Sequence, residues 1–448
     1  MADRRLARAL LFALVAICGA HAAAVPSVKT AEFGTVRVRA PTAAADFAIY
    51  FSGVQGLRAD DEAAIGALAG AGIAIAVIDT AQAIALLARR DDPCIDIAGP
   101  LEWLGRNAQH ALGGGFHAPI LVGRGIGAAL VYVALAQAGP LAFRGGASLD
   151  LQPHLRLSRP FCGLVPQPLT ALPPGVKLNA PWLLDSGGGA REAEIASYRK
   201  SSIPRVRVPA PGGTALDKRV GAAVDALIGH PGTGPSGLAD LPLVEVGLQS
   251  RRGMLVVILS GDGGWRDLDK RIAEVMAGQG YAVVGFDCLR YFWSRRTPAQ
   301  AAADLDRVLA HYLHATGSRE AVLVGYSFGA DVLPFLYNRL ADARRRQVRL
   351  VALLAPGLKA GFEIHLDEWF GDFADPQALP TAPELRAMPP GRVQCIYGTE
   401  EGDDSLCRTP QARGTRVEAV VGGHHFDGDF ERLSARIESA IGAAEAAN

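Results

Sequence analysis

The sequence predicts an α/β protein made of two similar domains, each a mainly parallel sheet with helices on both faces. Three observations support this fold class: short apolar segments alternate with amphipathic helical patterns, one stretch of sequence occurs twice, and a glycine-rich turn joins an apolar strand to a helix. The 448 residues suffice for two domains with cores of their own. Apolar residues form 49% of the chain and acids balance bases at 45 each, which indicates a globular protein and argues against nucleic-acid binding.

The first 24 residues are predicted to be a secretory signal peptide. Arginines are followed by a short apolar run and then by small residues, and we expect cleavage near Ala22 to Ala24. The apolar run is too short to span a membrane, and no other stretch reads as a transmembrane helix. We therefore expect an exported, soluble mature protein.

Export changes the interpretation of the cysteines, because thiols outside the cytoplasm tend to pair. Cys395 and Cys407 bracket a short acidic loop, and Cys94 with Cys162 is the natural second pair. Cys288 would be left over. The spacing fits no zinc pattern and does not by itself fix the connectivity. We expect no cofactor.

Part of the first half of the chain recurs in the second half. Residues 47–79 align with residues 255–287 without a gap. The matched positions include Ser52 with Ser260, Arg58 with Arg266, Asp61 with Asp269 and Asp79 with Asp287. The sequence therefore contains two copies of one strand and helix unit.

The match continues where residues 119–135 align with residues 321–337, and there Gly125 stands at the position of Ser327. We predict a first domain at 25–228, a linker rich in Gly and Pro at 229–242, and a second domain at 243–448. Strands of the second domain are expected at 243–248, 254–260, 281–287, 321–325, 349–355, 392–397 and 416–421.

The turn between the fourth of these strands and the helix after it carries a candidate nucleophile, Ser327. Gly325 and Gly329 flank it at two residues' distance, which is the strand, sharp turn and helix order of the nucleophile elbow in α/β-hydrolases. Small residues are needed there because the neighbouring chain passes close to a strained backbone. Such strings also occur by chance in a Gly-rich chain, so the surrounding sequence has to decide.

In this architecture the serine is followed along the chain by an acid and then a histidine. His424, with His425 as the alternate, follows the last strand. The acid is expected in the loop after the preceding strand, with Asp404 preferred, then Asp403, then Glu401. The backbone amides of Phe328 and Asp262 are the candidate donors to the oxyanion.

The competing chemical interpretation is a metal site. It would use His424, His425, Asp427 and Asp429. We favour the triad because its chain order already accounts for the histidine. The first domain has Gly125 in place of the serine, and its expected last strand reaches Gly212 and Gly213 with no histidine after them. We therefore predict that this domain is inactive and serves as a packing partner, a lid or a recognition surface.

The segments LSGDGGW, GYSFGAD, CIYGTEEGDDSLC and GGHHFDGD together resemble the VirJ/AcvB family of exported bacterial proteins. The resemblance covers residues 240–445, and the two-part chain looks like the longer AcvB type. It implies a periplasmic serine esterase of the α/β-hydrolase fold that hydrolyses lysyl-phosphatidylglycerol, an aminoacylated phospholipid of the membrane surface, to lysine and phosphatidylglycerol. It also implies a link to type IV secretion and virulence. It carries over Ser327, an acid at 401–404, and His424 or His425.

A cationic lysyl group would favour carboxylates near the pocket. Asp367, Glu368 and Trp369, in an acidic and aromatic segment, are candidates to bind it, although a solvated loop explains the segment equally well. Two other function classes stay open: a general lipase or carboxylesterase, and an interaction module that assists type IV secretion. We expect no nucleic-acid partner.

Overall fold

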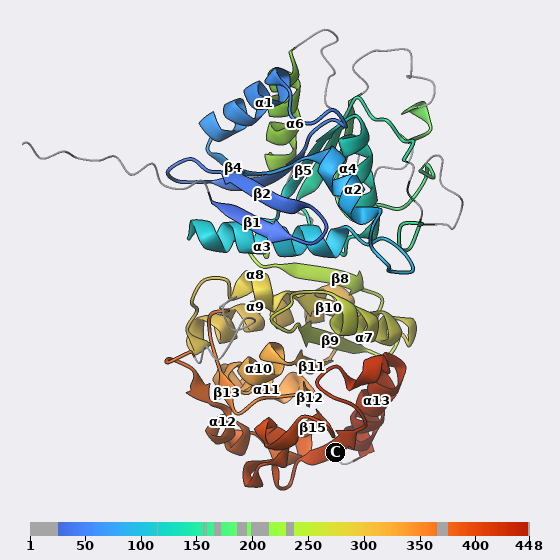
Figure 1. Cartoon of the computed structure of the whole chain (residues 1–448). Helices are drawn as coiled ribbons and strands as arrows, with labels where there is room; N and C mark the ends of the chain where they lie inside the picture. Colours follow the sequence, from blue (N-terminus) through green and yellow to red (C-terminus); the bar gives the residue numbers. More distant parts are fainter. Residues whose placement is uncertain are drawn as a thin grey trace, which may run out of the picture.

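The computed structural model describes residues 26–446 apart from 114, 156, 158, 165–171, 186–194, 199–214, 230–236 and 365–374. Three groups of residues discussed above therefore lie outside the described part: the signal peptide, Gly212 with Gly213, and the set Asp367, Glu368 and Trp369. The chain forms two α/β domains that lie one above the other in Figure 1.

The described part of the first sheet has seven strands in the order β1-β2-β4-β3-β5-β6-β7. Its strands are β1 (Ser27–Thr30), β2 (Gly34–Arg39), β3 (Asp46–Phe51), β4 (Ile73–Ile78), β5 (Ile120–Arg124), β6 (Gly145–Leu149) and β7 (Trp182–Asp185). The strands from β3 to β7 pair in parallel, and β1 and β2 form an antiparallel edge. The predicted mainly parallel sheet is confirmed.

The second sheet repeats this plan in the order β8-β10-β9-β11-β12-β15-β16. Its strands are β8 (Leu243–Gly247), β9 (Met254–Leu259), β10 (Ala282–Phe286), β11 (Glu320–Tyr326), β12 (Val348–Leu354), β15 (Val393–Gly398) and β16 (Arg416–Val420). β8 pairs antiparallel with β10 as β2 does with β4, and the other pairings are parallel. All seven strands predicted from sequence are present, and β13 (Lys359–Ala360) and β14 (Leu379–Pro380) add a small ribbon.

Helices cover both faces of each sheet. In the first domain they are α1 (Ala59–Gly70), α2 (Thr80–Leu87), α3 (Ala98–Leu112), α4 (Ile126–Gln137) and α6 (Leu216–Ile228). In the second they are α7 (Asp267–Gly278), α8 (Cys288–Tyr291), α9 (Pro298–Thr316), α10 (Phe328–Arg339), α11 (Asp342–Gln347), α12 (Thr381–Ala387) and α13 (Phe430–Ala446). In the first domain, α3 and α4 cover one face of the sheet, and α1 and α6 cover the other. In the second domain, α9 and α10 cover one face of the sheet, and α7 and α13 cover the other. Alternating strands and helices in the sequence therefore produce two doubly covered sheets.

Local sequence sets where individual elements begin and end. α9 begins at a capping box in which Thr297 and Gln300 bond each other's backbone amides, with Pro298 in the first turn, and it ends at Gly317 with φ of 65°. Leu238 and Leu241 fall within the predicted linker but are buried in the core of the second domain. The last residues of that linker are therefore part of the second domain.

Both expected disulfides are present. Cys94 pairs with Cys162, and Cys395 pairs with Cys407. Cys288 is free and fully buried, and burial raises the pKa of its thiol well above the usual value. The second disulfide ties β15 to the loop that follows it. Within the described residues, no helix combines the length and the apolar character that a membrane crossing requires.

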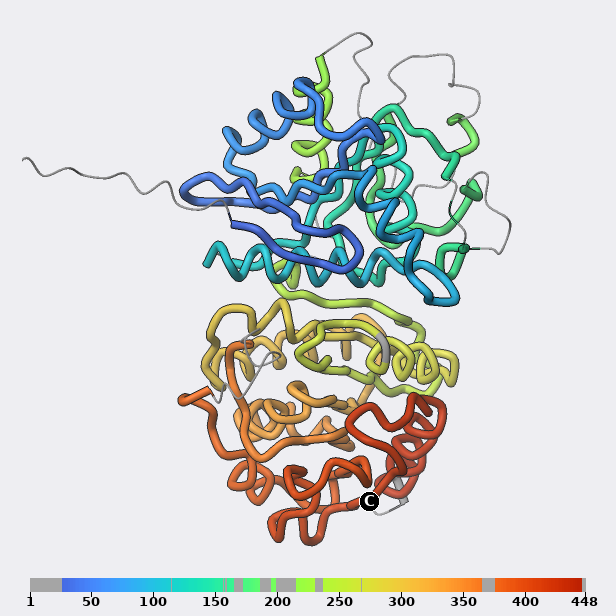
Figure 2. The backbone as a smooth tube through the Cα atoms, viewed as in Figure 1, coloured from blue at the N-terminus to red at the C-terminus, as the bar shows by residue number. Residues whose placement is uncertain are grey.

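The two domains meet along α3 of the first domain, which lies above α8 and β8 of the second (Figures 1 and 2). On the second domain's side, Trp265 follows β9 and is buried over Gly285 of β10. A Cβ atom at Gly285 would come within 2.3 Å of the indole ring, so this glycine makes the space that the ring occupies.

We expect Gly285→Ala to lower the free energy of unfolding by about 1–3 kcal/mol, because the rigid, buried indole has to move to admit a methyl group. Chemical denaturation of the two proteins would measure the difference. Gly442→Ala is the matched control: Gly442 lies in α13 with open space around it, and alanine there should stabilise the helix by about 0.5–1 kcal/mol. Equal effects of the two substitutions would contradict this account of Gly285.

Candidate active site

Ser327 lies at a sharp turn between β11 and α10, with φ of 51° and ψ of −120°. A Cβ atom at Gly325 would lie 2.6 Å from the carbonyl oxygen of Gly329, and one at Gly329 would lie 2.4 Å from that of Leu259. Both positions therefore require glycine. This close packing of helix against strand holds the serine in a backbone conformation that non-glycine residues rarely adopt.

His424 links the serine to an acid. Its Nε2 lies 2.8 Å from Ser327 Oγ, and its Nδ1 lies 2.7 Å from Glu401 Oε1. The residues come from the loops after β11, β15 and β16, which meet at the carboxyl edge of the parallel sheet. His425, the alternate, turns away and its Nδ1 lies 2.7 Å from the hydroxyl of Tyr326.

The preference for Asp404 as the acid is wrong. Glu401 occupies the position against His424, and its other oxygen accepts a hydrogen bond of 2.7 Å from the amide of Gly398. Beyond it the chain turns at Gly402, with φ of 66°, so Asp403 and Asp404 are exposed. Asp403 pairs with Arg408 instead. Both carboxylate oxygens of Glu401 are therefore hydrogen-bonded, and the side chain is 11% exposed.

The clue that sequence reasoning missed is the spacing of Glu401 from the strand end. Gly398 is the last residue of the strand, and Glu401 follows it by three residues. At this spacing the carboxylate can fold back and accept a hydrogen bond from the amide of Gly398, as a side chain does in a capped turn. Glutamate also has the extra methylene needed to reach the histidine from that position.

The loop proposed to provide an oxyanion donor lies next to the serine. A Cβ atom at Gly261 would come within 3.5 Å of Ser327 Cβ, and Asp262 is the next residue. Phe328 begins α10, so its amide is one of the free donors at a helix N-terminus. Ser260 fixes the start of the loop, because its Oγ accepts a hydrogen bond of 3.0 Å from the amide of Cys288.

The side chains of the alternative metal site have separate partners. His424 and His425 face different groups, as above. Asp429 accepts a hydrogen bond from the amide of Arg432 at the start of α13, and Asp427 lies against Gly422, where a Cβ atom would be 2.5 Å from Oδ1. In the described part of the chain, no group of three or more such residues converges on a point that a metal could occupy.

Asp331 is a residue of the site that sequence analysis did not single out. It lies one turn into α10, and its Oδ1 accepts a hydrogen bond of 2.6 Å from the amide of Gly357. Burial raises the pKa of this carboxyl well above its usual value, and the nearby charges of Asp262 and Glu401 raise it further. Carboxylates therefore concentrate beside Ser327. The position four residues after the serine, on the same helical face, was the available signal.

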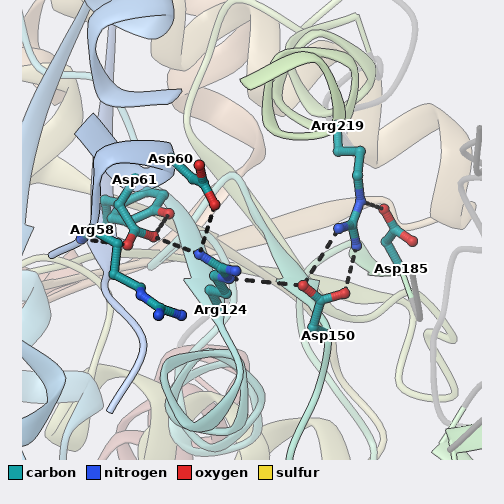
Figure 3. A network of polar contacts seen from close by, with 8 residues as sticks. Arg58, Asp60, Asp61, Arg124, Asp150, Asp185 and Arg219 are labelled. Atoms are coloured by element: carbon teal, nitrogen blue, oxygen red, sulfur yellow. Dashed lines mark hydrogen bonds and ion pairs between the residues drawn. The ribbon is translucent and has the colours of Figure 1, made fainter. Parts of the chain in front are cut away.

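The first domain keeps the elbow without the nucleophile. Gly125 has φ of 59° and ψ of −115°, and its amide donates to the carbonyl of Leu149 as Ser327's does to Leu354. Figure 3 shows an ion-pair network at this edge of the sheet. It joins Arg124 to Asp60, Asp61 and Asp150, and Arg219 to Asp150 and Asp185. Paired charges thus occupy the edge where the second domain holds its triad-like residues.

These features define the second domain as an α/β-hydrolase domain: a doubly covered parallel sheet, a nucleophile elbow, and a serine, histidine and acid in hydrogen-bonded sequence. Residues 253–445 match the family described as "Bacterial virulence protein (VirJ)". The match covers most of the second domain and agrees with the family that the sequence motifs predicted.

Other comparisons give weaker likenesses. No curated protein matches the chain. Similar solved structures include a lipase-esterase related protein from Clostridium acetobutylicum, at 14% identity over 44% of this chain and 98% of that one, with a TM-score of 0.32. An esterase of Pyrococcus furiosus shows 14% identity over 46% and 94%, with a TM-score of 0.32. Naproxen esterase from Bacillus subtilis shows 15% identity over 44% and 86%, also at 0.32. Such TM-scores are too low to support an argument, and the assignment depends on strand order and site geometry.

Glu401→Gln should lower kcat for ester substrates by about 10³- to 10⁴-fold, because an amide no longer stabilises the imidazolium or holds its tautomer. Hydrolysis of a p-nitrophenyl ester would measure this. Asp404→Asn, a change of the same kind in the same loop, should leave kcat within about twofold because the exposed side chain is distant from the histidine. A larger loss for Asp404→Asn than for Glu401→Gln would overturn the assignment of the acid.

Proposed function

We propose that the chain is a serine esterase that hydrolyses the aminoacyl ester of lysyl-phosphatidylglycerol to lysine and phosphatidylglycerol. The observation that supports the proposal is a pair of hydrogen bonds made by His424, one of 2.8 Å to Ser327 Oγ and one of 2.7 Å to Glu401 Oε1. The serine is at a strained elbow that exposes its hydroxyl at the edge of the sheet. The match of residues 253–445 to the VirJ family supports the same class.

The reaction follows from this geometry. His424 accepts the hydroxyl proton as Ser327 Oγ attacks the ester carbonyl, and Glu401 stabilises the imidazolium. The amides of Phe328 and Asp262 hold the oxyanion. The bond to the glycerol oxygen breaks, and His424 passes its proton to that oxygen, which releases phosphatidylglycerol. A water molecule, deprotonated by His424, then attacks the acyl-enzyme. The bond to Ser327 Oγ breaks, His424 returns the proton to that oxygen, and the amino acid is released.

The preference for a cationic acyl group is supported by the carboxylates around the serine. Asp331 lies one helical turn from Ser327, and Asp262 and Glu401 are close enough to raise its pKa. An ammonium group brought to this place would relieve the mutual repulsion of the carboxylates and gain charge-assisted hydrogen bonds. We also propose that Asp367, Glu368 and Trp369 contribute to the binding of the lysyl group.

The proposal extends to the compartment. The secretory signal predicted at 1–24 and the two disulfides fit an oxidising space such as the periplasm, where the enzyme would meet its lipid substrate at the membrane surface. Components of type IV secretion are proposed as partners on the family resemblance alone.

Purified mature protein should release lysine from vesicles that contain lysyl-phosphatidylglycerol, and Ser327→Ala should abolish the release, because the acyl-enzyme can no longer form. Free lysine is the readout, and circular dichroism confirms that the variant is folded. If wild-type protein releases no lysine but hydrolyses neutral esters, the protein is a general carboxylesterase. If it hydrolyses neither, the interaction module becomes the better hypothesis, and Ser327→Ala should then leave secretion intact.

Asp331→Asn should reduce the selectivity for cationic esters by about tenfold, because the substitution removes a carboxylate charge that attracts the cation. The probes are two p-nitrophenyl esters, one with a trimethylammonium group and one with an isosteric tert-butyl group, so that neither substrate titrates. In the wild type, selectivity should rise with pH, because the carboxyl gains its charge as pH passes the raised pKa of Asp331.

In Asp331→Asn that rise should flatten, while the amide oxygen can still accept from Gly357. The matched control is Asp403→Asn, which removes an exposed charge of the neighbouring loop. Unchanged selectivity and an unchanged pH profile in Asp331→Asn would show that this carboxyl does not recognise the substrate.

A further inference from the structure

We propose that the first domain positions the oxyanion-binding backbone of the second domain, through α3 and the two loops that flank β5 and α4. This inference rests on the proposed esterase function. Two segments of the second domain are concerned: the oxyanion loop, defined as residues 260–266, and the buttress segment, defined as residues 287–293. Both follow strands of the second sheet at the edge that carries Ser327.

The first contact is a group of charges, of which Arg106 is buried, Glu102 and Arg290 are half-buried and Arg266 is exposed. On α3, Glu102 pairs with Arg106 at 3.2 Å, with side chains that are 17% and 5% exposed. Burial raises the pKa of Glu102, while the charges of Arg106, Arg266 and Arg290 oppose the rise. Arg266 belongs to the oxyanion loop and Arg290 to the buttress segment. Glu102 lines the same small cavity as both of these arginines, so one carboxylate of the first domain lies near a guanidinium from each segment.

The second contact is apolar and involves Trp265. Leu141, which follows α4, packs against the second domain's core cluster that includes Trp265. A Cβ atom at Gly139 would lie 3.6 Å from the Trp265 carbonyl oxygen. The other side of the indole lies against Gly285 of the sheet, so the ring has no space to move toward the sheet. The oxyanion loop is thus held between its own sheet and the first domain.

The third contact is a line of aromatic rings. Phe116, before β5, stacks on Trp293 with ring centroids 4.9 Å apart, and Arg290 lies 5.5 Å from the centre of the Phe116 ring. Next to Trp293, the ring of Phe292 lies 5.1 Å from that of Phe328. Phe328 carries the proposed oxyanion donor that follows the nucleophile. Contacts from the first domain thus reach the oxyanion loop, which carries Asp262, and the buttress segment, whose Phe292 packs against Phe328.

The space between the two domains is small at this point. Residues of both domains line a cavity of about 30 Å³, which admits water and no substrate. Charges in such a place interact strongly and are costly to leave unpaired. Removal of the Glu102 charge would leave Asp287, which pairs with Arg290 at 3.3 Å, as the remaining carboxylate among the arginines that line this cavity. The oxyanion loop should then relax away from α3.

Glu102→Gln is the test, with Glu62→Gln as the matched control, because Glu62 forms an exposed ion pair with Arg39 within the first domain. In full-length protein, Glu102→Gln should lower kcat for p-nitrophenyl acetate about tenfold, less than the ~100-fold that loss of an oxyanion donor costs, with KM unchanged. Affinity for a phenylboronic acid, which mimics the tetrahedral intermediate at the serine, should fall by a similar factor. Glu62→Gln should change neither.

Hydrogen exchange of residues 260–266, followed by mass spectrometry, gives a readout that does not depend on activity. Exchange should be faster in Glu102→Gln than in the wild type and in Glu62→Gln. Phe116→Leu, which removes the aromatic contact without a charge change, should act in the same direction and serves if Glu102→Gln fails to fold. Folded variants with wild-type kcat, boronate affinity and exchange would overturn the inference. If the wild type hydrolyses no ester, the proposed function fails, and the exchange data alone decide the positioning role.

Discussion

The organisation of the second domain depends on how closely α10 approaches the sheet. Carbonyl oxygens lie so near Gly325 and Gly329 that no side chain fits at either position. This approach forces positive φ on the residue between them and directs its side chain out of the sheet edge. Everything else at the site is arranged around that direction: the histidine after β16, the acid after β15 and the loop after β9 all converge on the place to which Ser327 points.

The first domain shows that this geometry is a packing solution in its own right. Gly125 has nearly the same backbone angles as Ser327 but no reactive side chain. Its amide also keeps the hydrogen bond to a carbonyl of the next strand. The edge it faces is filled by arginine and aspartate side chains that form ion pairs with one another (Figure 3). The same sharp turn is therefore found in both domains, which differ in the residue at the turn and in the groups around it.

Features set by local backbone chemistry could be predicted from the sequence. The strands, the elbow glycines and the order of serine, acid and histidine follow from short-range patterns. The two disulfides agree with the expected cysteine pairs, although the spacing alone did not fix the connectivity. The choice among Glu401, Asp403 and Asp404 could not, because it depends on a turn at Gly402 that sends the later two side chains into solvent. Asp331 and the interface around Glu102 were missed for a related reason. Their environments are built from elements distant in sequence, so no local pattern marks them.

The bond between Cys395 and Cys407 has a consequence for how the acid is held. Cys395 is in β15, inside the sheet, and Cys407 is 12 residues later, beyond the turn. The loop between them is closed at both ends, so it has few conformations to gain when its hydrogen bonds open. Loops usually open at low free energy, independently of the sheet they join. Here the opening of the segment that carries Glu401 is coupled to the sheet, and the acid gains the local stability of a strand although it belongs to a surface loop.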